Sequence, residues 1–262
     1  MLKTRIIPTL LWKDHGLVKG VGFDSWRRVG TVLPAIKVYS TREVDELILV
    51  DITATGEARP PDCDSVAEFS AECFVPLTVG GGIRTIEHIR DLLRAGADKV
   101  SINSAAYDDP GLVREAASRF GAQCVVASID VRRLPDGRPV CYSHSGSRSQ
   151  DRAPASWARE LEALGAGEIL ITSVERDGTM EGYDLELVRA VADAVRIPVI
   201  ASGGAGSYAH LLAALRDGGA SAVAAASIFH FTQQTPLEAK HYLATHGIPV
   251  RRHQLASDTP KA

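Results

Sequence analysis

The sequence predicts a single (β/α)8 barrel, and three observations support this prediction. Eight short runs rich in β-branched residues alternate with segments of helical hydrophobic period along the 262 residues of the chain. The chain also repeats itself at about half its length. No linker-like stretch divides it, which favours one large α/β domain. An open doubly wound sheet is the alternative, but that fold often begins with a GxGxxG motif, which this sequence lacks.

Each predicted strand is short and apolar and ends at a polar or glycine-containing turn. In chain order the strands cover residues 5–11, 46–52, 75–79, 99–103, 124–130, 168–174, 198–202 and 222–226. Amphipathic segments such as residues 86–95 and 185–194 follow them and place apolar side chains on one helix face. The barrel is expected to span residues 1–255, in half-barrels of about 1–122 and 123–255. Residues 256–262 are expected to form a disordered tail.

The internal repeat is clearest in the glycine- and serine-containing loops. "VGGGI" (residues 79–83) precedes "SINSAA" (101–106), and "ASGGAG" (201–206) precedes "AAASIF" (224–229). The spacing from Gly81 to Ser104 equals the spacing from Gly204 to Ser227. The alignment of the halves also matches the first strand with the fifth, so that Leu11 aligns with Asp130.

Composition excludes several classes of function. The net charge is −3 and no block of Lys or Arg occurs, so no nucleic-acid or acidic-membrane surface is indicated. No apolar run approaches the ~20 residues of a membrane span, and the cytoplasm is the expected compartment. The four cysteines show no CxxC spacing and the eight histidines no HExxH pair, so we expect reduced thiols, no metal and no cofactor.

Two matched sets of residues have the composition of phosphate-binding loops. Ligands of (β/α)8 enzymes bind at the C-terminal strand ends, where glycines let backbone N–H groups approach an anion and a following helix N-terminus adds positive potential. We call Gly81, Gly82, Asn103 and Ser104 the first cradle, and Gly203, Gly204, Ala226 and Ser227 the second cradle. Asp177 and Gly178 of "ERDGT" are expected beside the second cradle. A single Gly-Gly pair commonly makes only a tight turn, but the duplication predicts an elongated ligand with a phosphate at each end.

Asp130 is the main catalytic candidate because it ends an apolar strand at the face where this fold places its chemistry. The alternative is a carboxylate that caps a turn. The last inward side chain of the first strand is Leu11, where a catalytic group would be expected. Asp51, at the end of the second strand, is a better substitute for it than Asp14, which lies beyond the first strand. We also expect Asp51 and Thr172, which lies near the end of the sixth strand, to bind the substrate.

The connection after the first strand, residues 13–30, is long for this fold and is predicted to be a lid over the active face. Three glycines, at positions 16, 20 and 22, can bend it. Lys19 can reach an anion, and Phe23 or Trp26 can cover a flat ring. A mobile surface loop is the alternative.

Four predicted strands begin with a charged residue at the other end of the barrel. These residues are Arg5, Glu46, Lys99 and Glu168, two positive and two negative charges that can pair around the barrel axis. Asp98 lies at the same end. The sequence alone does not decide whether such a ring surrounds a passage into the barrel or closes the barrel end with salt bridges, since ion pairs also have structural roles.

The motifs taken together resemble a known family. "RIIP", "VKG", "DITAT", "TVGGGIR", "GADKVSIN", "GAGEILITS", "RDGT", "GYD", "IPVIASGGAG" and "ASIFHF" are similar to the cyclase subunit of imidazole glycerol phosphate synthase, a lyase of histidine biosynthesis, over residues up to about 255. The resemblance implies a (β/α)8 barrel that takes ammonia from a partner class I glutaminase and uses it on a bisphosphorylated ribulosyl substrate. It also implies that the four-charge ring is the ammonia gate and that Asp98 can contact the glutaminase.

The sequence departs from that family at one position. The family uses two aspartates, at the ends of strands 1 and 5, as general acid and base, and Leu11 stands at the first of them while Asp130 matches the second. A leucine can neither donate nor accept a proton, so ordinary cyclase activity is in doubt. The first strand with Leu11, "GLVKG" and "SWRRVG" resemble cyclase paralogues associated with acetamidino-sugar formation in surface polysaccharides, where ammonia is thought to pass to a separate sugar amidotransferase.

Three functions therefore remain open. The first is a paralogue that serves sugar amidination, the second is a histidine-pathway cyclase in which another group replaces the missing acid, and the third is a non-catalytic barrel that activates a glutaminase. Retention of Asp130, Lys19 and both cradles counts against the third. The pattern also resembles the sister isomerase of histidine biosynthesis, but "DITAT", "GADKVSIN" and the charge ring fit the cyclase better.

Overall fold

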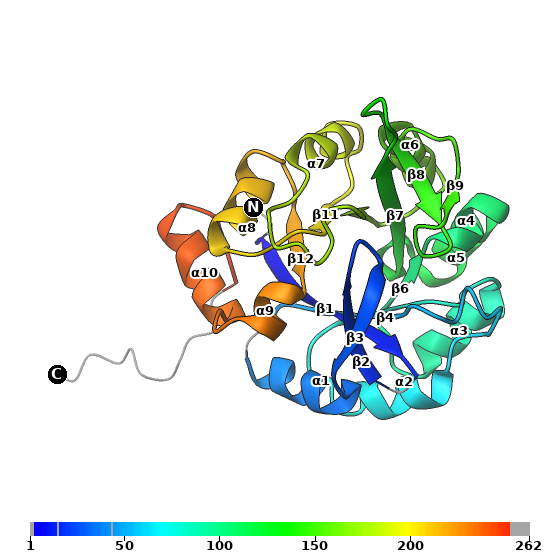
Figure 1. The fold of residues 1–262 in the computed structure, drawn as a ribbon. Coiled ribbons are helices and arrows are strands. Elements are labelled where there is room, and N and C mark those ends of the chain that lie inside the picture. Colours follow the sequence, from blue (N-terminus) through cyan, green and yellow to red (C-terminus); the bar gives the residue numbers. More distant parts are fainter. Residues whose placement is uncertain (1–2, 15, 43, 252–262) are drawn as a thin grey trace.

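Eight parallel strands close into a barrel in the computed structural model, which describes residues 3–14, 16–42 and 44–251 (Figure 1). The strands are β1 (Arg5–Lys13), β4 (Leu47–Asp51), β5 (Leu77–Gly80), β6 (Lys99–Ile102), β7 (Val125–Arg133), β10 (Glu168–Ser173), β11 (Val199–Ser202) and β12 (Ala222–Ala225). They pair in chain order, and the pairing of β12 with β1 closes the sheet. The predicted TIM barrel is confirmed, with all eight strands present and small shifts at their ends. Four of these strands fall in residues 1–122 and four in residues 123–255.

Helices surround the barrel, one or more after each strand. They are α1 (Val32–Thr41), α2 (Cys63–Ser70), α3 (Ile86–Arg94), α4 (Ser104–Asp108), α5 (Gly111–Phe120), the short 3-10 helix η1 (Ala122–Cys124), α6 (Pro154–Ala163), α7 (Leu185–Ala192), α8 (Tyr208–Arg216), α9 (Ser227–Phe231) and α10 (Pro236–Thr245). Side-chain caps at Thr85, Asp184, Ser207 and Thr235 accept hydrogen bonds from orphan N–H groups at helix starts. The expected tail, residues 256–262, lies outside the described residues. Among those described, none of the helices combines the length and the apolar character that crossing a bilayer requires.

The barrel interior is filled in layers because side chains of each strand alternate between the inside and the helices. An inner apolar cluster contains Ile7, Ile48, Val126, Leu170, Ile200, Ala222 and Ala224. The larger cluster lies between the strands and the helices and includes, for example, Ile6, Leu10 and Ile89. Both faces of the strands are therefore buried, which explains why the strands are continuous apolar runs in the sequence.

Two β-hairpins extend the barrel on its C-terminal side. The first hairpin, β2 (Gly16–Val21) and β3 (Asp24–Gly30), pairs with the end of β1 (Figure 1). The segment predicted as a lid is thus regular β structure. Gly16 and Gly20 lie within a strand and only Gly22, at φ +62°, forms the turn. The second hairpin, β8 (Pro139–Ser143) and β9 (Arg148–Ser149), pairs with the end of β7.

Candidate active site

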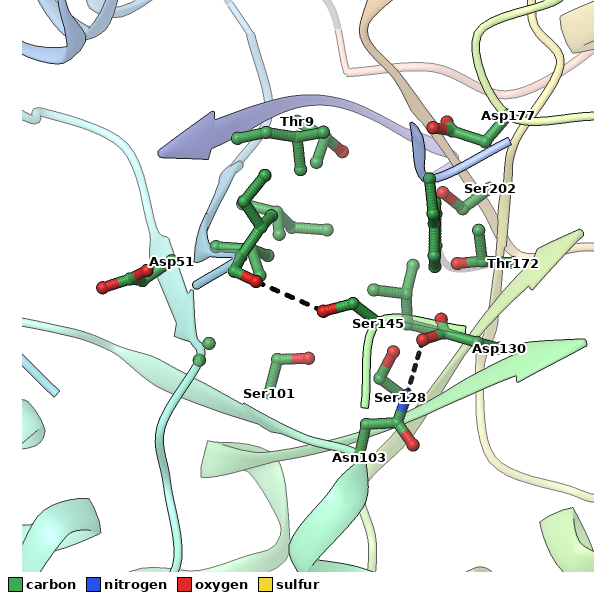
Figure 2. A pocket seen from close by; sticks show the side chains of 18 of the residues that line it. Thr9, Asp51, Ser101, Asn103, Ser128, Asp130, Ser145, Thr172, Asp177 and Ser202 are labelled. Atoms are coloured by element: carbon green, nitrogen blue, oxygen red, sulfur yellow. Dashed lines mark hydrogen bonds between the residues drawn. The ribbon is translucent and has the colours of Figure 1, made fainter. Parts of the chain in front are cut away.

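A cavity of about 380 Å³ opens at the C-terminal ends of the barrel strands (Figure 2). The structure brings the residues of both cradles and the acid/base candidates to this one cavity. The predicted residues that line it are Leu11, Lys19, Asp51, Gly81, Gly82, Asn103, Ser104, Asp130, Thr172, Asp177, Gly178, Gly203, Gly204, Ala226 and Ser227. Phe23 and Trp26 of the first hairpin line it as well.

Asp130 lies on the inner face of β7, where its side chain is almost fully buried. The amide of Asn103 donates a hydrogen bond of 2.7 Å from Nδ2 to Oδ2 of Asp130 (Figure 2). Burial, followed by the negative charge of Asp177, raises the pKa of Asp130 to about 7, although the bond from Asn103 favours the ionised form. A carboxyl group with this pKa exchanges a proton readily at neutral pH, as a general acid or base must.

Leu11 lies across the barrel from Asp130, because β1 and β7 are four strands apart in an eight-stranded barrel. It pairs with Val50 of β4 and with Val18 of the first hairpin. Leu11, Val50 and Ile52 give this side of the cavity an apolar wall. Asp130, on the opposite side of the cavity, therefore faces no carboxylate from β1.

Asp51 does not fill this gap. Its Oδ1 accepts hydrogen bonds from the backbone N–H groups of Thr53 and Ala54, at 3.0 and 3.1 Å, and its Oδ2 pairs with Nη2 of Arg59 at 3.2 Å. Figure 2 shows the carboxylate pointing away from Asp130. Asp51 thus holds the loop after β4. Asp14 is not among the residues that line the cavity.

The two cradles have matching backbones. Gly81 and Gly203, each the first residue after its strand, have left-handed φ angles of +104° and +88°, and a Cβ atom on either would overlap the carbonyl oxygen of the residue that ends the preceding strand. Asn103 and Ala226 precede the short helices α4 and α9 with similar dihedral angles, φ −119° and ψ −85° against φ −128° and ψ −66°. Both sites therefore need glycine and present backbone N–H groups in the same way.

The cradles differ in what covers them. In the first, Oγ of Ser104 accepts a hydrogen bond of 3.0 Å from the backbone N–H of His144, at the tip of the second hairpin. In the second, Oγ of Ser227 is buried and has no hydrogen-bond partner within the described ranges. A buried hydroxyl without a partner is costly, so this atom is suited to bind a ligand.

Each hairpin reaches from its own half-barrel to the opposite half. Lys19 of the first hairpin is buried and its Nζ lies 3.1 Å from both carboxylate oxygens of Asp177. The backbone N–H of Gly22 also donates to the carbonyl oxygen of Asp177, at 2.9 Å. On the second hairpin, Oγ of Ser145 donates to the carbonyl oxygen of Ile52 at 3.2 Å, as the dashed line in Figure 2 shows.

Arg132, two residues after Asp130, joins the two hairpins. Its Nε donates to the carbonyl oxygen of Gly146 at 2.8 Å, and its Nη2 donates to that of Gly22 at 3.2 Å. One guanidinium group therefore fixes both hairpin turns at the rim of the cavity.

The barrel also contains a layer of hydroxyl groups, of which only Thr172 is predicted from the sequence as a site residue. Its members are Thr9, Ser101, Ser128, Thr172 and Ser202 (Figure 2). Small polar residues within an apolar strand carry no local signal of function. Their inward alternation with the residues of the inner apolar cluster is the pattern that could have found them.

The predicted charges at the N-terminal end of the barrel form a closed ring. Nη1 of Arg5 lies 2.8 Å from carboxylate oxygens of both Glu46 and Glu168, and Nζ of Lys99 lies 3.0 and 3.2 Å from the same two residues. Oε2 of Glu168 is buried without a hydrogen-bond partner among the residues described. Asp98, at the same end, is exposed, and its Oδ2 accepts a 2.8 Å hydrogen bond from the backbone N–H of Leu77.

A family model described as "Histidine biosynthesis protein" matches residues 5–235. The chain belongs to this family. The matched span contains every barrel strand, both hairpins and both cradles. The family contains isomerases and cyclases of the TIM-barrel fold, so membership defines the class of enzyme without selecting one reaction.

Proposed function

We propose that this histidine-biosynthesis-family barrel takes ammonia from a class I glutaminase docked at the charge ring and passes it to a cavity that holds a bisphosphorylated ligand. We further propose that it is a paralogue of the cyclase subunit that serves sugar amidination, with a sugar amidotransferase as the final acceptor. The observation that carries this proposal is the position of Asp130, which has a raised pKa and lies across the barrel from an apolar wall at Leu11 instead of a second aspartate on β1.

The layers along one strand support the proposed route of ammonia from the ring to the cavity. On β1 the sequence of inward residues is Arg5 in the ring, Ile7 in the apolar cluster, Thr9 in the hydroxyl layer and Leu11 at the cavity. An apolar layer admits neutral ammonia far more readily than ammonium or another ion, because burying an unpaired charge is costly. Oε2 of Glu168, which has no hydrogen-bond partner within the described ranges, supplies an acceptor at the entrance.

The altered wall argues against ordinary cyclase chemistry. Cyclisation in the related enzymes divides proton donation and proton removal between two aspartates, whereas Leu11 can do neither. The absence of one acid-base group costs about 10²- to 10⁴-fold in the steps that it serves. The remaining features, two cradles and a buried Asp130 without a partner aspartate on β1, suit a barrel that binds the ligand and handles ammonia without completing the cyclisation.

One observation favours the histidine-pathway cyclase as a second candidate. Asp177 raises the pKa of Asp130 by its charge, so a second carboxylate lies within electrostatic reach of the first. In this alternative Asp177 replaces the missing acid after releasing Lys19, to which it is paired here.

The test is turnover of the bisphosphorylated ribulosyl substrate with excess ammonium salt, which removes the need for a glutaminase. We expect the wild type to bind this substrate but not to turn it over, and Leu11→Asp to gain turnover that Leu11→Asn, the matched polar control, does not. Turnover by the wild type that is lost in Asp130→Asn and Asp177→Asn would instead establish the cyclase. Addition of a glutaminase and glutamine then shows whether the barrel stimulates glutamine hydrolysis and whether Lys99→Ala, in the ring, abolishes the delivery of ammonia.

A further inference from the structure

The tip of the second hairpin has an unusual backbone and lies over the first cradle. His144, Ser145 and Gly146 all have left-handed φ angles, +52°, +55° and +74°. Such a conformation is uncommon for residues other than glycine and persists only where the surrounding structure fixes it. Here it places the backbone N–H of His144 on Oγ of Ser104, and His144 is one of the residues that line the cavity.

A hydrogen-bond relay orients the imidazole ring. Nε2 of Gln150 donates to Oγ of Ser143 at 2.7 Å, and Oγ of Ser143 lies 2.8 Å from Nδ1 of His144. The amide nitrogen of Gln150 can only donate, so the oxygen of Ser143 accepts there. Ser143 is fully buried, and Nδ1 is the acceptor available to its O–H among the described residues. The hydroxyl therefore donates to Nδ1, and the proton of the neutral imidazole is on Nε2.

We propose that His144 is a ligand-binding residue of the first cradle, which donates its Nε2–H to the phosphate that this cradle holds. The inference rests on the proposed function, which supplies the bisphosphorylated ligand. Within the described part of the chain Nε2 makes no hydrogen bond of its own. The side chain is half-buried, so the relay holds Nε2–H in a fixed orientation while the ring stays partly exposed to solvent.

Acidic groups on the same rim are already engaged. Asp108 lies 3.9 Å from Nη1 of Arg148, and Oδ1 of Asp109 accepts a hydrogen bond of 2.9 Å from the backbone N–H of Gly111. Among the described residues, His144 is the only histidine that lines the cavity, and the Ser227 hydroxyl of the second cradle has no hydrogen-bond partner. His144 thus makes the two ends of the cavity chemically different, so that an elongated ligand with two unlike phosphate ends binds in one direction.

The first experiment reads the tautomer directly, by NMR of the full-length protein with ¹⁵N-labelled histidine. His144 is assigned from the signal that His144→Asn removes, asparagine being chosen because it tolerates a left-handed backbone. We expect the neutral Nε2–H form in the wild type and a mixture of tautomers in Ser143→Ala. Ser147→Ala is the matched control, because the hydrogen bond that Oγ of Ser147 makes within the described part of the chain is to the backbone carbonyl of His144 and not to its imidazole. A tautomer that is unchanged in Ser143→Ala overturns the relay.

The second experiment titrates the wild type and His144→Asn with inorganic phosphate and follows the amide signals of Gly82 and Gly204, one in each cradle. We expect phosphate to bind roughly tenfold more weakly at Gly82 in the variant and equally at Gly204, since one hydrogen bond to a charged group is lost at the first cradle only. Equal affinities at Gly82 in the two proteins, or equal weakening at both cradles, overturn the role of His144 and leave the proposed function intact. An absence of phosphate binding at both cradles of the wild type overturns the proposed function as well.

Discussion

Replacing Asp130 by Asn is expected to make the protein progressively more stable, relative to the wild type, as the pH rises. The pKa of Asp130 in the folded protein is raised to about 7, chiefly by burial, whereas an unfolded chain has an Asp pKa of about 3.9. Between these values the folded state binds a proton that the unfolded state has lost, so the free energy of unfolding falls with rising pH. The asparagine variant has no such proton and lacks this slope. Its carbonyl oxygen can still accept the hydrogen bond from Asn103.

The magnitude follows from the two pKa values. Over the range from pH 5 to pH 8, the shift corresponds to a loss of about 2–3 kcal/mol of unfolding free energy in the wild type relative to Asp130→Asn. Urea unfolding of both proteins at intervals across this range measures the difference, and all other titrating groups cancel in the comparison. Any effect of the substitution on packing shifts the unfolding free energy by the same amount at every pH and does not alter the slope.

The exposed Asp136 provides the matched control. Its hydrogen bond with Arg138 lowers its pKa, so Asp136→Asn should differ from the wild type by a constant amount above pH 5. A constant difference for Asp130→Asn over the same range would refute the reasoning, because it would mean that Asp130 is already ionised at pH 5. The acid-base role proposed for it would then lose its physical basis.

Three further predictions concern the rim of the cavity. Lys19→Met should lower the free energy of unfolding by about 3–5 kcal/mol, because it leaves the carboxylate of Asp177 without its cation, and adding Asp177→Asn should recover most of this loss. Additive effects of the two substitutions in urea unfolding would contradict the pairing. Arg132→Met should increase amide hydrogen exchange in the turns of both hairpins together, and an increase in one turn alone would show that the hairpins are held separately. In thermal unfolding, Gly81→Ala should destabilise the protein by about 1–3 kcal/mol more than Gly137→Ala, because both glycines have positive φ but only a Cβ at Gly81 would meet a carbonyl oxygen. Equal destabilisation by the two substitutions would contradict this steric explanation.

Local physical chemistry explains why so much of the fold could be predicted. Strands that are buried on both faces have to be apolar throughout, and the glycines at the cradles have to accommodate left-handed backbone angles, so both leave signals in a single sequence. The duplication then fixes the pairing of loops from the two halves. The residues of the first hairpin are predicted as a lid that its glycines bend, and not as paired strands, because glycine is uncommon inside strands. Gly16 and Gly20 nevertheless lie in a strand, where Gly20 allows Trp26 to approach closely. The second hairpin could have been inferred from the first by the same duplication.

The sequence by itself determined the barrel, the two cradles, the identity of the four charges and the substitution of Leu11 for an acid, because each depends on residue type and spacing along the chain. Only the tertiary structure decided that Asp51 is engaged with its own loop, that Lys19 pairs with Asp177 and that His144 lies over Ser104. These contacts join residues of different loops, and the geometry of the closed barrel brings them together. The pKa of Asp130 is likewise a property of the closed barrel, since it arises from burial and from a charge 47 positions further along the chain, at Asp177.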